Sequence, residues 1–137
     1  MIFQFNKSEI DKLLAWVFAD PKNQAMLEIV QKNVSMNGDL TFKKHIKIGS
    51  VMMRMQIYPL ENGDVELNIK DASIAGLSVF GVIRKKAGEL IISSFNQYAP
   101  QCNVWKNEKG NIQIHVPGVA FKQFGIVGES VLLELFI

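Results

Sequence analysis

Residues 62–100 change their hydrophobic period once, and this change constrains the fold more than any other feature. The first part alternates, with Val65, Leu67 and Ile69 pointing one way and polar residues between them. A period of two is typical of a strand with one buried face. From Phe80 to Tyr98 apolar residues instead recur every three or four positions, which predicts an amphipathic helix that ends before the following proline. Because a one-faced sheet needs a cover, we expect this helix to pack against it.

The N-terminal part of the chain predicts a pair of short helices. Asn6 with Glu9 three positions later matches a capping box, which predicts that a helix begins there. Asp20-Pro21 predicts the end of that helix and the start of a second, because proline fits the first helical position. We expect the pair over about residues 7–34, packed at one end or edge of the sheet. The alternative to plain packing is a helical hairpin that covers a cavity.

Alternating patterns predict the remaining strands, over about residues 40–48, 51–58, 65–70, 102–106, 112–116 and 131–137. The lysine on the apolar face of the first strand, Lys44, predicts an edge position or a bulge. The last strand is apolar on both sides, which predicts a central position or a covered second face. The segment from Val119 to Phe124 is expected to be an irregular connection.

These patterns together predict an α+β fold. A bent antiparallel sheet of about six strands packs on one long amphipathic helix, with an N-terminal helical pair. The 137 residues have the size of one domain, so we expect a single domain over residues 1–137. The sheet and the central helix are expected over about residues 39–137. A chain of this length buries roughly 65–70% of its unfolded surface, so it needs no disulfide or metal to fold.

Composition and charge exclude several classes of protein. The net charge of +2 is too small to predict a nucleic-acid partner or an acidic membrane partner. Cys102 is the only cysteine, so no disulfide can form within the chain, which agrees with a reducing compartment. The first residues lack a signal-peptide pattern, and the apolar run from Ile74 to Ile83 is too short and glycine-rich to cross a bilayer. We therefore expect a cytoplasmic protein without a transmembrane segment.

No motif predicts catalysis, a metal or a cofactor. His45 and His115 fall on the polar faces of different strands, where solvated side chains are expected and metal ligands do not converge. Cys102 with His115 is conceivable as a nucleophile and base, but a half-buried structural thiol is favoured. Asp64 and Glu66 are turn and strand-face carboxylates, and we expect no buried pair for acid–base catalysis. The chain is expected not to be an enzyme.

Methionines are concentrated in one strand, at Met52, Met53 and Met55. Methionine lines adaptable apolar surfaces, so this strand indicates either a groove for an acyl chain or partner segment, or an ordinary core. We expect a non-enzymatic protein that holds a lipid or other apolar ligand between sheet and helix. The residues expected to line that site are Met53, Met55, Leu67, Ile69, Ile83, Leu90 and Ile91. The alternative is a protein–protein interaction module with a filled core, forming a homo-oligomer.

One stretch resembles a known family. Residues 61–79, ENGDVELNIKDASIAGLSV, form an alternating strand with a small-residue corner, and the helix after them exits through Tyr98-Ala99-Pro100 into a second strand over residues 110–116. This order is similar to the YpmS-like family of small bacterial envelope proteins. The resemblance implies a long curved sheet around a helix, comparable in shape to lipid-binding tubular folds, and an envelope-associated location as the alternative to the cytoplasm. It implies no catalytic residues.

Two features depart from the family pattern. Family members usually carry an N-terminal membrane anchor, whereas the first residues here predict none. The proline that usually follows the small-residue corner is replaced here by Phe80-Gly81.

Overall fold

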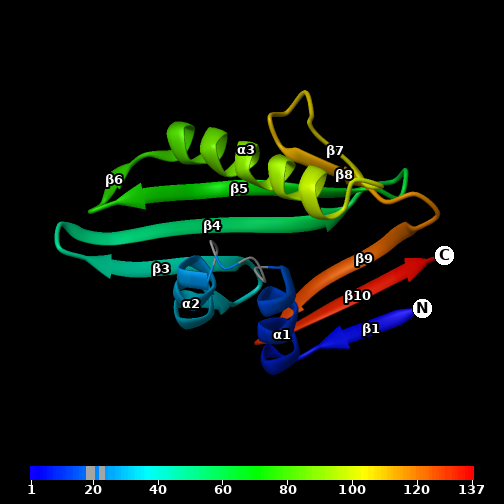
Figure 1. The fold of residues 1–137 in the computed structure, drawn as a ribbon, viewed down its shortest axis with the longest axis horizontal. Coiled ribbons are helices and arrows are strands. Elements are labelled where there is room, and N and C mark those ends of the chain that lie inside the picture. The colour runs from blue at the N-terminus through cyan, green and yellow to red at the C-terminus, as the bar shows by residue number, and fades with distance from the viewer. Residues whose placement is uncertain (18–20, 22–23) are drawn as a thin grey trace.

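A computed structural model describes residues 1–17, 21 and 24–137 (Figure 1). Within these ranges the architecture is α+β, as expected, with three helices and two antiparallel sheets. In chain order the elements are β1 (Ile2–Phe5), α1 (Lys7–Val17), α2 (Gln24–Asn33), β2 (Val34–Met36), β3 (Leu40–Ile46), β4 (Gly49–Pro59), β5 (Val65–Ile74), β6 (Leu77–Ser78), α3 (Phe80–Tyr98), β7 (Asn103–Lys106), β8 (Ile112–His115), β9 (Ala120–Val127) and β10 (Ser130–Phe136).

The larger sheet has the strand order β2-β3-β4-β5-β8-β7, and β6 pairs with the end of β5. Its register places Phe42 opposite Met53, and Met53 opposite Ala72. Paired residues point to the same face of a sheet, so this face is apolar across three strands. The opposite face is polar, because Tyr58 pairs with Glu66 and Glu66 pairs with Gln113. The one-faced alternation predicted from the sequence is therefore confirmed.

β3 is an edge strand over part of its length. β2 pairs only with residues 40–42 of β3, so the segment that contains Lys44 has β4 as its single neighbour in the sheet among the described residues. The lysine on the apolar face thus lies at an edge, one of the two positions that the sequence predicts for it.

The smaller sheet has the order β1-β10-β9, so β10 is central, as its two apolar faces predict. The expectation of an irregular connection over residues 119–124 is wrong, because β9 runs through it. A bulge explains the error: Leu133 pairs with Phe124 and Leu135 with Phe121, which leaves Lys122 as an extra residue. Phe121 and Phe124 therefore share a face although they are three positions apart, and the period of two is hidden.

α3 covers the apolar face of the larger sheet alongside β5 (Figure 1). Beneath it lies a buried cluster of Val65, Leu67, Ile112 and Ile114, against which Ile91 of α3 also packs. Gly88 is the buried residue of α3, and a β-carbon there would lie 3.9 Å from the side chain of Ile112. Helix and sheet are thus in ordinary van der Waals contact at this point.

α1 begins as predicted. The backbone N–H of Glu9 donates to Asn6 Oδ1 at 2.9 Å, and the N–H of Asn6 donates to Glu9 Oε1 at 3.3 Å, which is a complete capping box. Gln31 of α2 donates to the carbonyl of Asp11 at 3.2 Å and ties the two helices together. The predicted break at Asp20 lies outside the described residues.

Candidate ligand-binding cavity

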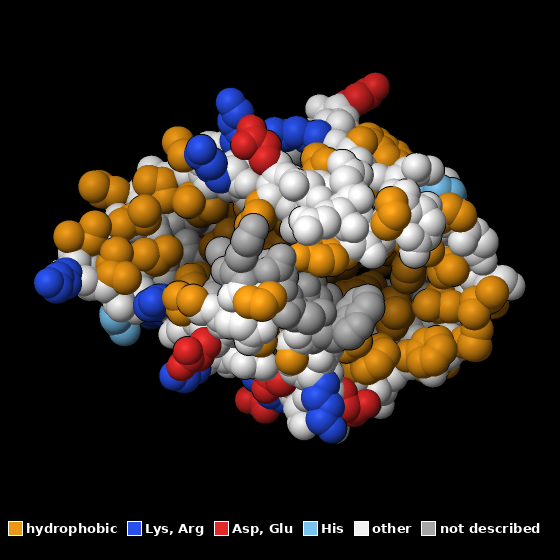
Figure 2. All heavy atoms as spheres, in the orientation of Figure 1, with side chains coloured by type: hydrophobic (Ala, Val, Ile, Leu, Met, Phe, Trp, Pro, Cys, Tyr) orange, Lys and Arg blue, Asp and Glu red, His pale blue; other side chains and the backbone are white. Residues whose placement is uncertain are grey.

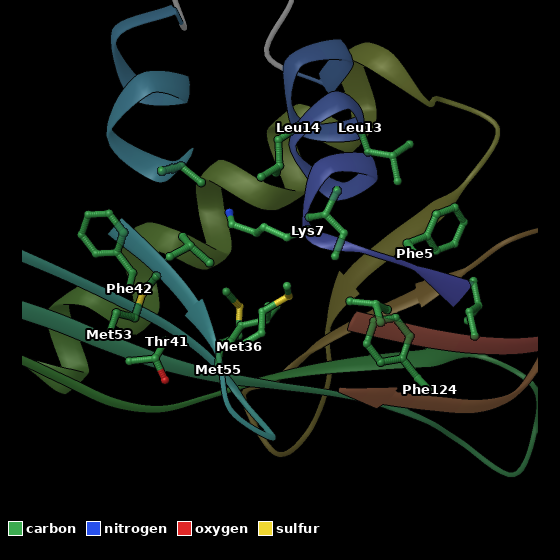
Figure 3. A pocket seen from close by; sticks show the side chains of 16 residues that line it. Phe5, Lys7, Leu13, Leu14, Met36, Thr41, Phe42, Met53, Met55 and Phe124 are labelled. Atoms are coloured by element: carbon green, nitrogen blue, oxygen red, sulfur yellow. The ribbon is translucent and has the colours of Figure 1, made fainter. Parts of the chain in front are cut away.

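A cavity of about 430 Å³ lies between the N-terminal helices and the two sheets (Figure 3). Among the residues that the structure describes, its lining is apolar except for one lysine and one threonine. The lining residues that the structure describes are Phe5, Lys7, Ile10, Leu13, Leu14, Val30, Val34, Met36, Leu40, Thr41, Phe42, Met53, Met55, Phe124, Val131 and Leu133.

Both N-terminal helices and both sheets contribute these walls, with Val30 from α2. β3 and β4 supply Phe42, Met53 and Met55 from the apolar face of the larger sheet. α1 supplies Leu14 and its neighbours, because residues three and four apart share one face of a helix. The smaller sheet closes the side with Phe124 and other residues of β9 and β10, and Figure 3 shows the ring of Phe124 beside the cavity.

The described walls of the cavity offer no net charge to a ligand. Lys7 is the single charged residue among the described lining residues, and its Nζ lies 2.8 Å from Asp11 Oδ1 on the next turn of α1. This ion pair neutralises the ammonium group. The remaining walls provide dispersion contacts and hydrophobic burial, which favour an uncharged hydrocarbon over a polar molecule.

The volume is appropriate for a long aliphatic chain. A cavity of roughly 150 Å³ accepts one benzene molecule, which has six carbon atoms. A space about three times larger therefore holds on the order of 18 carbon atoms. Ligand pockets in proteins begin at roughly 300 Å³, so this cavity lies within the normal range.

The residues expected to form one site lie in separate places in the structure. Met53 and Met55 line the cavity, whereas Leu67 and Ile69 line a separate hollow of about 10 Å³ beneath α3. None of the three α3 residues lines the cavity: Ile83 and Ile91 are half-buried, and Leu90 is 54% exposed. The candidate site therefore lies between α1, α2 and the sheets, and not between α3 and the sheet as expected. A space of about 10 Å³ holds at most one water molecule, so there is no room for a ligand there.

Sequence reasoning missed the contributions of α1, α2 and the smaller sheet. The apolar stripe of α1 that includes Ile10 and Leu14 was visible, and a helical cover over a cavity was the alternative to plain packing. The structure shows these helices lining the cavity. Phe124, Val131 and Leu133 could not be found in this way, because their approach to α1 depends on how two sheets pack.

A second group of residues also differs from expectation. Asp64 and Glu66 are buried, with exposures of 4% and 1%, although the sequence predicted no buried pair of carboxylates. Asp64 accepts a hydrogen bond from Gln113 Nε2 at 2.8 Å, and its other oxygen lies 2.8 Å from His115 Nδ1. His115 is thus not simply solvated. These residues occupy the polar face of the larger sheet, away from the cavity.

Hydrogen bonds keep both carboxylates ionised. Burial acts to raise the pKa of Asp64, but its donors, Gln113 and His115 among them, outweigh burial and hold the pKa below its usual value. Burial opposes ionisation of Glu66 too, yet donation from Tyr58 and Asn107 lowers its pKa. Burial and the hydrogen bond to this carboxylate raise the pKa of Tyr58 to about 12.

An open hollow of about 480 Å³ lies over this polar network, lined by Leu60, Glu66, Trp105, Lys106, Asn107, Glu108, Lys109 and Gln113. The carboxylate of Glu66 is already occupied by its two donors. Asn107 also accepts from the backbone N–H groups of Lys109 and Asn111 and thereby fixes the turn between β7 and β8. We therefore assign this network to the stability of the turns.

The described residues contain no group of three or more His, Cys, Asp or Glu side chains that could hold a metal ion. Cys102 is half-buried. Among the helices in the described ranges, none is both long and apolar enough to cross a membrane.

Comparisons with known proteins do not assign this chain to a family. No family model, no curated protein and no solved structure matches this chain. The resemblance to the YpmS-like family therefore stays a prediction.

Proposed function

We propose that this protein binds a lipid or another molecule with a long aliphatic chain, and that it holds this chain in the cavity without chemical reaction. The observation that carries the proposal is the cavity of about 430 Å³ with apolar walls from α1, α2 and both sheets. Met53 and Met55 contribute flexible side chains, which can adapt to ligands of different shape.

The apolar walls support binding of an aliphatic chain. Each methylene group that leaves water for such walls contributes about 0.8 kcal/mol to binding.

The chemistry of the lining supports binding rather than catalysis. General acid–base catalysis needs a titratable side chain within reach of the substrate. The single charged side chain among the described lining residues, Lys7, is paired with Asp11. The buried carboxylates Asp64 and Glu66 lie on the other face of the sheet.

Native mass spectrometry of the protein purified from cells, before and after organic extraction, tests this proposal. We expect a bound mass that is lost on extraction and is identified as a lipid. The substitution Val131→Trp places a large side chain in the cavity and should abolish the bound mass. Val127→Trp is the matched control, because Val127 is 72% exposed on β9 and should leave the bound mass unchanged.

Two results would contradict the proposal. Wild-type protein without any bound mass, combined with no uptake of added fatty acid or phospholipid, would show that the cavity is not a ligand site. Equal loss of the ligand in the Val131→Trp and Val127→Trp variants would show that the ligand binds elsewhere. Circular dichroism of both variants shows whether each one is folded.

Self-association is the second candidate function, and β1 supports it. This strand pairs with β10 on one side, and no described residue pairs with its other side. Its Ile2 is 68% exposed and Phe3 39% exposed. An exposed apolar edge strand is a template for pairing with another chain. Light scattering should then detect a dimer that Ile2→Lys dissociates, and a wild-type monomer at high concentration would exclude this function.

A further inference from the structure

Exposed apolar side chains gather at the end of the molecule where the β3–β4 and β5–β6 turns lie. We call this group the apolar tip, and it comprises Ile46, Ile48, Leu77 and Val82, with exposures of 40%, 70%, 73% and 64%. Figure 1 places both turns and the start of α3 at the left end, and Figure 2 shows hydrophobic side chains covering that end. The tip is formed by β3, the β3–β4 turn, β6 and α3, whereas the helical walls of the cavity come from α1 and α2.

The segments that carry the tip are held together as one unit. The N–H of Ala75 donates to the carbonyl of Ser50 at 2.9 Å and joins the two turns. Gly49 has a φ of +137°, and a β-carbon there would lie 2.8 Å from the β-carbon of Ala75, so only glycine permits this approach. The N–H of Val79 donates to the carbonyl of Ala72 at 3.1 Å and fixes the start of α3.

Lysines give the end of the molecule that carries the tip a positive charge. Lys43, Lys44 and Lys47 lie on β3 and in the β3–β4 turn, and Lys85 and Lys86 follow Val82 on α3. The acidic residue Asp71 of β5 is paired with Arg54 at 2.6 Å. Lys43, Lys47, Lys85 and Lys86 are exposed. The net charge of +2 hides this asymmetry, because most of the acidic residues lie elsewhere in the chain.

We propose that the apolar tip inserts into the surface of an anionic lipid bilayer. Large aliphatic side chains would enter the boundary between headgroups and acyl chains, while the surrounding lysines contact anionic headgroups. A second copy of the chain fits this surface less well, because two tips in contact would bring like charges together. The inference does not depend on a ligand in the cavity.

The tip and the cavity share one face of the β3–β4 hairpin. Phe42 lines the cavity, and Ile46 lies four residues further along β3. Side chains at even spacings in a strand point to the same face, so Ile46 continues the face on which Phe42 lies. Docking through the tip would therefore turn the Phe42 end of the cavity toward the membrane.

Vesicle co-sedimentation tests the proposal. The full chain is mixed with vesicles of phosphatidylcholine alone or of phosphatidylcholine with phosphatidylserine, at low and high salt. We expect stronger binding to the anionic vesicles, weakened by salt. The double variant Ile48→Ser/Leu77→Ser should lower the affinity at least about tenfold, since two large apolar side chains no longer insert.

Two further variants separate insertion from charge. Lys43→Glu/Lys47→Glu should lower binding to anionic vesicles by about tenfold or more and remove the preference for them over neutral vesicles. Val127→Ser is the matched control, because Val127 is 72% exposed in the other sheet and outside the tip. Its binding should equal that of the wild-type protein.

Absence of vesicle binding by the wild-type protein would overturn the proposal. Equal loss of binding in the Val127→Ser control would do the same, since general surface hydrophobicity would then explain the interaction. A dimer that Ile48→Ser/Leu77→Ser dissociates, without vesicle binding, would assign the tip to self-association. The native mass measurement of the cavity ligand is independent of all these outcomes, so each proposal fails separately.

Discussion

Replacing Glu66 with alanine is expected to lower the free energy of unfolding by about 2–5 kcal/mol, although Glu66 lies outside the cavity. Its side chain is 1% exposed and accepts hydrogen bonds from the Tyr58 hydroxyl and from Asn107 Nδ2. Removal of the carboxylate leaves the Tyr58 hydroxyl without this acceptor, at roughly 1–3 kcal/mol. The loss at Asn107 is smaller, because its Nδ2 also lies 3.4 Å from Gln113 Oε1. The free energy of unfolding of a typical domain is about 5–15 kcal/mol, so a change of this size is easily measured.

Urea unfolding followed by far-UV circular dichroism measures this change. Glu66→Gln keeps one carbonyl acceptor but loses the charge and presents an amide donor, so we expect a smaller loss of about 1–2 kcal/mol. Glu61→Ala is the control, because Glu61 is an exposed carboxylate in the neighbouring turn and should change stability by less than about 0.5 kcal/mol. The slope of the unfolding free energy against urea should be the same in all variants.

A double-mutant cycle isolates the contact with Tyr58. Tyr58→Phe removes one donor, so Glu66→Ala should cost less in the Tyr58→Phe background than in the wild-type background. The reasoning is refuted if Glu66→Ala changes stability no more than Glu61→Ala does. It is also refuted if the two substitutions at positions 58 and 66 are strictly additive.

Three further predictions concern ionisation and helix capping. Because the folded state lowers the pKa of Asp64, its contribution to stability is complete above the unfolded value of about 4 and is lost as the pH falls through the lower folded pKa. Asp64→Asn should therefore flatten the acid side of a plot of urea midpoint against pH, and an unchanged acid side would contradict this. The pKa of Tyr58 is raised to about 12, so its contribution is lost as the pH rises from about 10 toward 12, and Tyr58→Phe should reduce the alkaline loss. Asn6→Ala should lower the free energy of unfolding, measured by thermal unfolding, by about 1 kcal/mol, and Asn6→Ser should leave it almost unchanged. Equal losses of stability in the two variants would argue against the capping box.

Local patterns predicted most of the elements. The helix over Phe80–Tyr98 has the bounds expected from its period and the following proline, and the Asn6–Glu9 box begins α1 as expected. β9 was missed because its bulge at Lys122 breaks the alternation. β1 was missed because four residues carry too little pattern, and their pairing with β10 joins opposite ends of the chain.

The candidate site was predictable only in part. Met53 and Met55 were expected to line it, because methionines are concentrated in that strand, and both line the cavity. Leu67 and Ile69 have the same alternation and face the same side of the sheet, yet they lie beneath α3 with almost no free space. Nothing in a strand pattern tells which helix covers which part of a shared apolar face.

Local features follow from the order of residues alone: the apolar and polar faces of each strand, the stripe of each helix and the stop signals between them. Spacing along the chain encodes these features directly. The close packing of α3 on the sheet and the cavity beside α1 and α2 depend instead on the three-dimensional fold, because faces from distant segments meet there. The burial of Asp64 and Glu66 depends on it too, since His115 and Asn107, which satisfy them, lie 51 and 41 residues away along the chain.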